Sequence, residues 1–231
     1  MKWAYGITTV PERRYNYLPG TLKSLKEAGF NHPTLFVDGP SGDYSEFDLP
    51  IVKRHSKIMA WGNWLLALQE LWIRNPFADR YAIFQDDMVC YQNLRQYLEH
   101  CKLEDNQYWN LLTFPENENR NPTRKTGWYM SNQRGRGAVG LVFPNAAVPR
   151  FLSSSVFVMK SANKRCPARN IDGTTVDTAV KLGIREMVHM PTLIWHTGDC
   201  SAIGNPQHKK PSSFKGEDFN ALELLPKVSH V

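Results

Sequence analysis

Two adjacent aspartates, Asp86 and Asp87, follow an apolar segment near the middle of this 231-residue chain. The apolar segment, residues 81–84, is typical of a buried strand, so the sequence predicts that both carboxylates stand at a strand end. Removing two neighbouring carboxylates from water costs free energy unless a cation compensates them. Their hard oxygen ligands would suit Mg²⁺, Mn²⁺ or Ca²⁺. An isolated Asp-Asp pair is also consistent with a loop that begins with two hydrated aspartates.

Polar residues also lie at the ends of two other expected strands. Thr8 and Thr9 end an expected first strand, and Asp38 follows an expected second one. In an open parallel sheet, ligands bind beyond the carboxyl ends of the strands. We therefore expect Asp38 to accept a hydrogen bond from a ribose hydroxyl or a base N–H, and Asp87 to hold a metal on a diphosphate. The alternative for Asp38 is an ordinary turn with an Asx hydrogen bond, and Arg13 either contacts phosphate or is exposed at a helix entrance.

Strand and helix patterns alternate through the first half of the chain, which predicts an α/β fold with crossover helices. Gly29 follows an apolar helical stripe and is expected to cap that helix. No internal repeat or linker divides the chain, so we expect residues 1–231 to form a single domain with a mostly parallel central sheet flanked by helices. Strands are expected at 3–9, 34–37, 51–53, 81–84, 109–114, 138–143 and 187–194. Helices are expected at 18–28, 64–72, 91–101, 145–152 and 176–182.

Two segments carry no periodic pattern. Residues 115–137 are polar and rich in Asn, Pro and Gly, which predicts a flexible loop of the kind that often covers a binding site. Residues 205–231 form a basic, proline-containing tail that we expect to lie across the surface. The four cysteines lack Cys-x-x-Cys spacing, which favours reduced thiols. No apolar run reaches the roughly 20 residues needed to span a bilayer and no signal-peptide pattern is present, so a cytoplasmic protein without a membrane partner is expected.

The net charge of +6 fits a polyanionic partner, and equally a hydrated surface with a modest lysine excess. The cations are unevenly distributed, because a long stretch without acidic residues begins after Glu118. Trp128 and Tyr129 are interleaved with these cations, a combination that suits stacking on bases and contact with phosphates. It equally suits a mobile loop that closes over a nucleotide diphosphate. The cations of this stretch are Arg120, Arg124, Lys125, Arg134 and Arg136.

The order and spacing of several motifs over residues 3–205 resemble a GT-A glycosyltransferase, a single-domain fold that binds a nucleotide sugar and holds a metal with an Asp-x-Asp motif. Gln85, Asp86 and Asp87 occupy the place of that motif, with Gln85 where an acid often stands. His196 begins a His-x-Gly segment that resembles the late segment whose histidine ligates the metal. The resemblance therefore implies Asp87 and His196 as ligands of Mn²⁺ or Mg²⁺.

Other segments resemble parts of the same family's donor site. Asp177, in Thr-Val-Asp at 175–177, resembles the acidic catalytic base that opens a helix, and Asp172 is the rival for this role. Gly137 begins a small-residue strand like the one beside the donor sugar, where a missing side chain allows close approach. The residues assigned to the nucleotide sugar are Thr8, Thr9, Arg13, Asp38, Trp61, Asn63, Gln85, Asp86 and Gly137.

These observations predict an enzyme that moves a hexose from a nucleotide diphosphate sugar, UDP-glucose by default, to an acceptor hydroxyl with inversion. The charge distribution favours double-stranded DNA as the acceptor, at the hydroxymethyl group of a modified pyrimidine, as in phage DNA modification. The target base would have to be flipped out of the stack. The alternatives are a polysaccharide or protein acceptor, a nucleotidyltransferase, and a nucleic-acid-binding protein without catalysis. The residues expected near the base or its phosphates are Trp128, Tyr129, Arg134 and Arg136.

Overall fold

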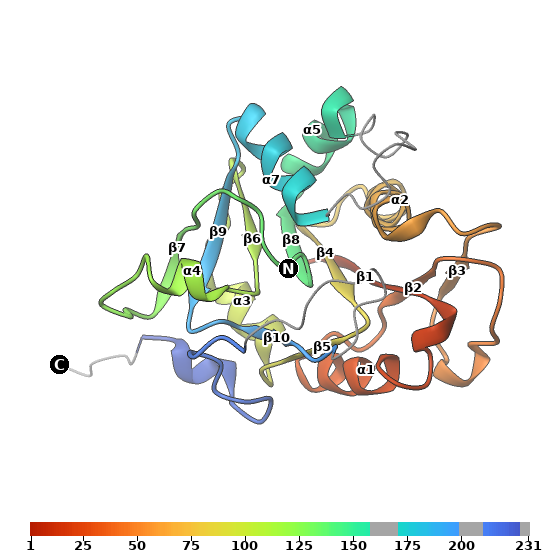
Figure 1. Ribbon diagram of the computed structural model, residues 1–231, viewed down its shortest axis with the longest axis horizontal. Coiled ribbons are helices and arrows are strands. Elements are labelled where there is room, and N and C mark those ends of the chain that lie inside the picture. Colours follow the sequence, from red (N-terminus) through yellow and green to blue (C-terminus); the bar gives the residue numbers. More distant parts are fainter. Residues whose placement is uncertain (158–170, 199–209, 227–231) are drawn as a thin grey trace.

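A computed structural model describes residues 1–157, 171–198 and 210–226 and contains one large sheet and one small one (Figure 1). The strands of the large sheet are β1 (Trp3–Thr9), β2 (Thr34–Val37), β3 (Ile51–Lys53), β4 (Arg80–Gln85), β6 (Gln107–Asn110), β7 (Gly127–Met130), β8 (Gly140–Pro144) and β9 (Arg185–Met190). They lie in the order β3-β2-β1-β4-β8-β6-β9-β7. The small sheet is an antiparallel pair, β5 (Met88–Cys90) and β10 (Ile194–His196).

The direction of the strands divides the large sheet. β3, β2, β1 and β4 are all parallel to one another, whereas β8 runs antiparallel to both β4 and β6. Beyond β8, β9 is parallel to β6 and β7 is antiparallel to β9. This mixed but mostly parallel sheet confirms the predicted fold class. Because β1, β2 and β4 are parallel, their carboxyl ends share one edge of the sheet.

Helices cover both faces of the large sheet (Figure 1). One face packs against α1 (Leu18–Glu27) and α3 (Leu94–His100), and the other against α2 (Met59–Arg74), α5 (Ala147–Ser153) and α7 (Ile171–Lys181). β4 supplies both apolar cores, because its alternate residues Ala82 and Phe84 face α1 while Tyr81 and Ile83 face α2. The remaining short elements are α4 (Pro115–Glu118), η1 (Pro11–Arg13), η2 (Ser45–Phe47) and η3 (Ala221–Leu224).

Local sequence signals explain where the first two long helices end. α1 buries Leu18 and Leu25 on its inner face, and Gly29 then adopts a φ of +94° that lets Phe30 N donate to Leu25 O over 2.8 Å. α2 ends at Arg74, two residues before a proline that cannot continue the helix. Both boundaries agree with the prediction.

The segment 115–137 is not the continuous loop that its composition predicted. It contains α4 and β7, and β7 pairs with β9 as the edge strand of the large sheet. The strand that pairs with β7 lies about 60 residues further along the chain. The local sequence of a four-residue strand therefore does not predict this pairing. The predicted strand 109–114 is shorter, and the predicted strand 187–194 is divided between β9 and β10.

The described part of the C-terminal tail is anchored rather than only basic. Phe214 stacks on Tyr91 with ring centroids 5.1 Å apart, and Gln92 pairs with Asn220 in an isolated parallel bridge. Residues 205–209 and 227–231 of the predicted tail lie outside the described residues. Within the described ranges, no helix is long and apolar enough to cross a membrane, and Cys90 and Cys101 are free thiols.

Candidate active site at the carboxyl edge of the parallel strands

The three predicted strand-end motifs meet at one edge of the sheet. Thr9, at the end of β1, donates from its hydroxyl to Asp86 Oδ2 over 2.6 Å. Asp38, just beyond β2, donates its backbone N–H to Thr9 O over 2.9 Å. Thr8 lies opposite Gln85 of β4 in the strand register. The parallel strands therefore gather these polar groups as the sequence predicted.

Asp86 and Asp87 are both buried, with 3% and 1% of their surfaces exposed. The guanidinium of Arg13, in η1 directly after β1, bridges them: Nη1 lies 2.9 Å from Asp86 Oδ1 and also contacts Asp87 Oδ2. Burial, together with the charge of Asp87, raises the pKa of Asp86 to about 6 despite the hydrogen bonds from Arg13 and Thr9. Arg13 is therefore mostly buried, and its positive charge compensates the two carboxylates.

His196 reaches the acid pair through the small sheet. β10 pairs with β5 so that His196 stands opposite Met88, and Thr197 N donates to Asp87 O over 2.8 Å. His196 Nε2 then lies 2.9 Å from Asp87 Oδ2. Burial alone would raise the pKa of Asp87, but His196 and Arg13 outweigh it and the pKa is lowered. Asp87 is therefore held as a carboxylate.

Asp87 and His196 would provide only two of the ligands that a divalent cation needs. Asp87 Oδ1 is buried and has no hydrogen-bond partner within the described residues, so one carboxylate oxygen is left for a ligand. A Cβ at Gly198 would lie 2.6 Å from Asp87 Oδ2 and 3.0 Å from His196 Cε1, so a glycine keeps the space beside both side chains open. No group of three or more His, Cys, Asp or Glu side chains in the described ranges could hold a metal. Such a site would rely on water and substrate phosphates to complete the coordination, as Mg²⁺ sites commonly do.

Thr21 supports the acid pair and was not found from the sequence. Its hydroxyl lies 2.8 Å from Asp86 O and accepts from Met88 N at 3.0 Å, which fixes the backbone on both sides of Asp87. A polar residue on the buried stripe of α1, between Leu18 and Leu25, was the available signal.

The residues predicted to meet the nucleotide beyond β2 have partners within the protein. Asp38 Oδ1 accepts from Ile58 N over 2.7 Å, which joins the end of β2 to the start of α2. Asn63 is buried; its Oδ1 accepts from Arg54 Nε, and its Nδ2 donates to Phe36 O, both over 2.8 Å. Sequence reasoning missed Arg54, which is buried at the end of β3 and also pairs with Glu70. Trp61 is buried on α2 and packs against Trp64 and Phe157.

Gln85 connects β4 with the segment before β8, in which Gly137 lies. Gln85 Nε2 donates to Ala138 O over 3.1 Å. Gly137 has a φ of +74°, and a Cβ there would meet the Phe114 ring at 2.4 Å and Leu112 at 2.7 Å. The absence of a side chain at Gly137 is therefore required by packing within the protein itself.

The helix that carries the predicted base begins earlier than expected. Asp177 does not open a helix: α7 already includes Ile171, so Asp177 lies six residues further on and is exposed. Asp172 occupies the first turn, where its Oδ2 accepts from Gly137 N over 2.8 Å. An apolar face that starts at Ile171, with Thr174 and Val176 also buried, explains the longer helix. Asp172 therefore joins α7 to the segment before β8.

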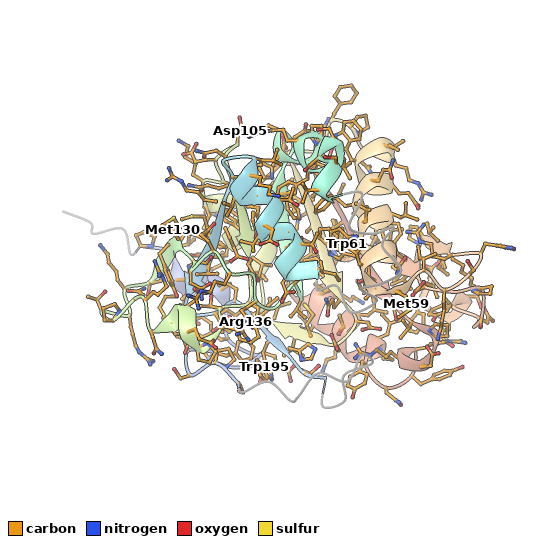
Figure 2. The ribbon with its side chains drawn as sticks, turned by 45° about the horizontal axis from the view of Figure 1, so that its top comes forward. Met59, Trp61, Asp105, Met130, Arg136 and Trp195 are labelled. Carbon is orange, nitrogen blue, oxygen red and sulfur yellow. The ribbon has the colours of Figure 1, made fainter. Side chains whose placement is uncertain are left out.

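The residues predicted for the acceptor separate into two groups. Trp128 stacks on Trp109 with centroids 4.2 Å apart, and Tyr129 donates to Asn117 O over 2.9 Å while burial raises its pKa to about 12. Arg134 and Arg136 are exposed. Figure 2 shows Arg136 toward the same end of the molecule as Trp195 of β10, with Asp105 at the opposite end. This agrees with the strand register, which brings the residues before β8 to the carboxyl end of β4.

A second buried acid, Glu186 of β9, lies apart in the mixed half of the sheet. Its Oε1 accepts from Tyr108 Oη at 3.0 Å and Asn110 Nδ2 at 3.2 Å, and its Oε2 accepts from Ser131 Oγ at 2.5 Å. Only 1% of the residue is exposed, and burial raises its pKa. The hydrogen bonds tie β6, β9 and the residue after β7 together. We call this group the Glu186 cluster.

No family model and no curated protein matches the sequence. Among solved structures, the chain is similar to GalNAc-T7, which was solved with UDP, GalNAc and Mn²⁺, at a TM-score of 0.60 and 8% identity over 85% of this chain. It spans 44% of the length of that protein. At such identity the likeness is one of fold, and it confirms the GT-A architecture expected from the sequence.

Two further solved structures have lower TM-scores. A nucleotidyl transferase from Methanothermobacter thermautotroptrophicus has a TM-score of 0.49 and 12% identity, covering 81% of this chain and 86% of its own. The galactosyltransferase LgtC, in complex with donor and acceptor sugar analogs, has a TM-score of 0.47 and 11% identity, covering 80% of this chain and 73% of its own.

Proposed function

We propose that this protein is a metal-dependent glycosyltransferase that moves a hexose from a nucleotide diphosphate sugar to an acceptor hydroxyl. The observation that carries the proposal is the buried carboxylate of Asp87, which has one oxygen between Arg13 and His196 and the other without a hydrogen-bond partner among the described residues. It lies at the carboxyl edge of parallel strands, where α/β sheets bind ligands. The shared fold with GalNAc-T7, solved with UDP and Mn²⁺, supports the same conclusion.

Each side chain of the site has a proposed task. Asp87 and His196 would hold Mn²⁺ or Mg²⁺, which would supply positive charge to neutralise the diphosphate. Asp177 accepts the proton of the acceptor hydroxyl as its oxygen bonds to the anomeric carbon, and Asp172 is the rival for this task. The bond from that carbon to the diphosphate breaks, and the diphosphate leaves with the electron pair. Attack from the opposite face would invert the anomeric centre.

The donor is proposed to lie along the edge formed by the ends of β1, β2 and β4. UDP-glucose is the first candidate, and the UDP bound to GalNAc-T7 favours a uridine nucleotide as the starting choice. The two oxygens of Asp86 accept from Thr9 and Arg13, so Asp86 would hold these two residues in place beside Asp87. The residues proposed to line the donor are Thr8, Thr9, Arg13, Asp38, Trp61, Asn63, Gln85, Asp86 and Gly137.

The proposed acceptor is the hydroxymethyl group of a modified pyrimidine in double-stranded DNA. The exposed Arg134 and Arg136 support this choice, because cations near the site suit phosphate contacts that weaken with salt. Trp128 and Tyr129 are proposed to lie beside the flipped base. This acceptor implies action in the cytoplasm of a bacterial or phage-infected cell.

One experiment tests the donor, the acceptor and the reaction together. The protein is incubated with Mn²⁺, a panel of nucleotide sugars and hydroxymethylated double-stranded DNA, and the products are analysed by mass spectrometry. We expect a mass increase of one hexose on the DNA and release of a nucleoside diphosphate. Transfer to a polysaccharide or protein but not to DNA would show that the acceptor is that polymer. Release of pyrophosphate would indicate a nucleotidyltransferase. No turnover of any nucleotide sugar would contradict the proposed function.

A further inference from the structure

Two consecutive arginines follow β1, and only one of them faces the acid pair. Arg13 turns toward Asp86 and Asp87, and only 14% of its side chain is exposed. Arg14 turns away and pairs with Glu46 through Nε and Nη2, at 3.1 and 2.8 Å. Arg14 therefore provides a matched control for the charge and size of Arg13.

Arg13 occupies the same carboxylate that would bind a divalent cation. Its guanidinium and the imidazole of His196 both contact Asp87 Oδ2. With Asp87 1% exposed and Asp86 4% exposed by side chain, water screens these charges weakly. A divalent cation at Asp87 would bring positive charge beside a buried guanidinium, and like charges in such surroundings repel.

A nucleotide diphosphate bound at the strand edge would offset the repulsion between the cation and Arg13. It adds negative charge at the strand edge, and the planar donors of a guanidinium match phosphate oxygens well. The guanidinium lies over the Tyr17 ring, 5.2 Å from its centroid, and this contact stabilises the side chain beside the two aspartates. Arg13 can then serve the acid pair when no anion is present and the diphosphate when one is.

We propose that Arg13 is a positioning residue that competes with the divalent metal for Asp87 and thereby makes metal binding depend on the nucleotide. The inference rests on the proposed function, because it takes the diphosphate and the metal as the ligands of this edge. One side chain then has opposite effects on the two ligands. Arg13 weakens the binding of metal alone and strengthens the binding of nucleotide alone.

Two titrations on the full chain test these opposite effects. In the first, Mn²⁺ alone is titrated and free Mn²⁺ is followed by electron paramagnetic resonance. Arg13→Met is expected to bind Mn²⁺ about tenfold more tightly than the wild type, and Arg14→Met to behave as the wild type. In the second, UDP is titrated calorimetrically in excess chelator. Arg13→Met is expected to bind UDP about tenfold more weakly, again with Arg14→Met unchanged.

Removing Arg13 also leaves two buried carboxylates without its charge, so the variant can lose stability. If Arg13→Met is unfolded in metal-free buffer, Mn²⁺ is expected to restore its native circular dichroism, and Arg13→Lys is expected to remain folded with wild-type Mn²⁺ affinity. Unchanged or weaker Mn²⁺ binding by folded Arg13→Met, or no recovery with Mn²⁺, would overturn the inference. If the Mn²⁺ effect is found but no nucleotide sugar is turned over, the proposed function fails and the competition stands.

Discussion

The Asp86–Asp87 pair, just beyond β4, and the Glu186 cluster of β6 and β9 are both buried, but their oxygens are used differently. Glu186 receives three neutral donors, and both of its oxygens have partners. Asp87 has two basic groups on one oxygen and no hydrogen-bond partner for the other within the described ranges. A buried acid whose oxygens are all engaged holds strands together. A buried acid with an unfilled oxygen beside fixed positive charge is arranged for a ligand.

The largest effect expected from this comparison is on catalysis. Asp87→Asn keeps the shape of the side chain but removes the charge that binds the metal, so turnover is expected to fall on the order of 1000-fold. The rate of UDP release from UDP-glucose with Mn²⁺ measures it, and circular dichroism checks the fold. A loss of less than tenfold would mean that Asp87 resembles Glu186 in being structural.

Removing the Glu186 carboxylate should affect stability instead. Glu186→Ala leaves the donors of Tyr108, Asn110 and Ser131 unpaired in the core, which is expected to lower the free energy of unfolding by about 4 kcal/mol. Denaturant unfolding measures this loss. Turnover per folded molecule should stay within twofold of the wild type, and a large loss of turnover at full folding would break the distinction between the two clusters.

A buried histidine of β9 adds a pH dependence to the mixed half of the sheet. His189 is fully buried, and its Nε2 and Nδ1 lie 2.7 Å from Tyr97 Oη and Pro191 O. Burial lowers its pKa to about 4, so the folded protein keeps the ring neutral while an unfolded chain takes up a proton near pH 6.5. Its contribution to stability is complete above pH 6.5 and is lost as the pH falls toward 4, by up to about 3 kcal/mol.

Unfolding free energies measured between pH 4 and 7.5 check the pH effect. His189→Gln should remove this part of the slope, whereas His196→Gln should leave it in place. An equal slope in the wild type and His189→Gln would contradict the assignment.

Two glycines give the smallest and most local contrast. An added Cβ at Gly198 would press on Asp87 and His196, so Gly198→Ala is expected to weaken Mn²⁺ binding in the presence of UDP about tenfold with little change in stability. Gly137 has a positive φ, and a Cβ added there would clash with Phe114. Gly137→Ala is therefore expected to lower the free energy of unfolding by about 2 kcal/mol. Calorimetry and thermal unfolding measure the two effects. The reverse pattern would show that the space beside Asp87 has no role in binding.

The parallel half of the fold could be predicted from sequence because its signals are local. Thr9 ends one short apolar strand and Asp38 and Asp87 follow two others, and parallel pairing brings such ends together. The mixed half depends on pairings between distant segments, and β7 is recognisable only beside β9. Trp128 and Tyr129 belong to β7, although the sequence predicts a loop there.

The site itself was predictable only in part. His196 was identified through a resemblance, and its contact with Asp87 depends on the pairing of β10 with β5 about 105 residues earlier. Arg13 and Arg14 look alike in the sequence, and only the geometry of η1 decides which of them turns inward. The length of α7 decides which acid stands in its first turn, and that is Asp172 rather than Asp177.

The proposed reaction depends on a divalent cation held by Asp87 at the strand edge. Anomalous diffraction at the manganese absorption edge, from crystals grown with Mn²⁺ and UDP, tests it most directly. We expect one strong anomalous peak in direct contact with the Asp87 carboxylate and the His196 imidazole, and no peak in crystals of Asp87→Asn. A peak elsewhere, or none in the wild type with UDP bound, would contradict it.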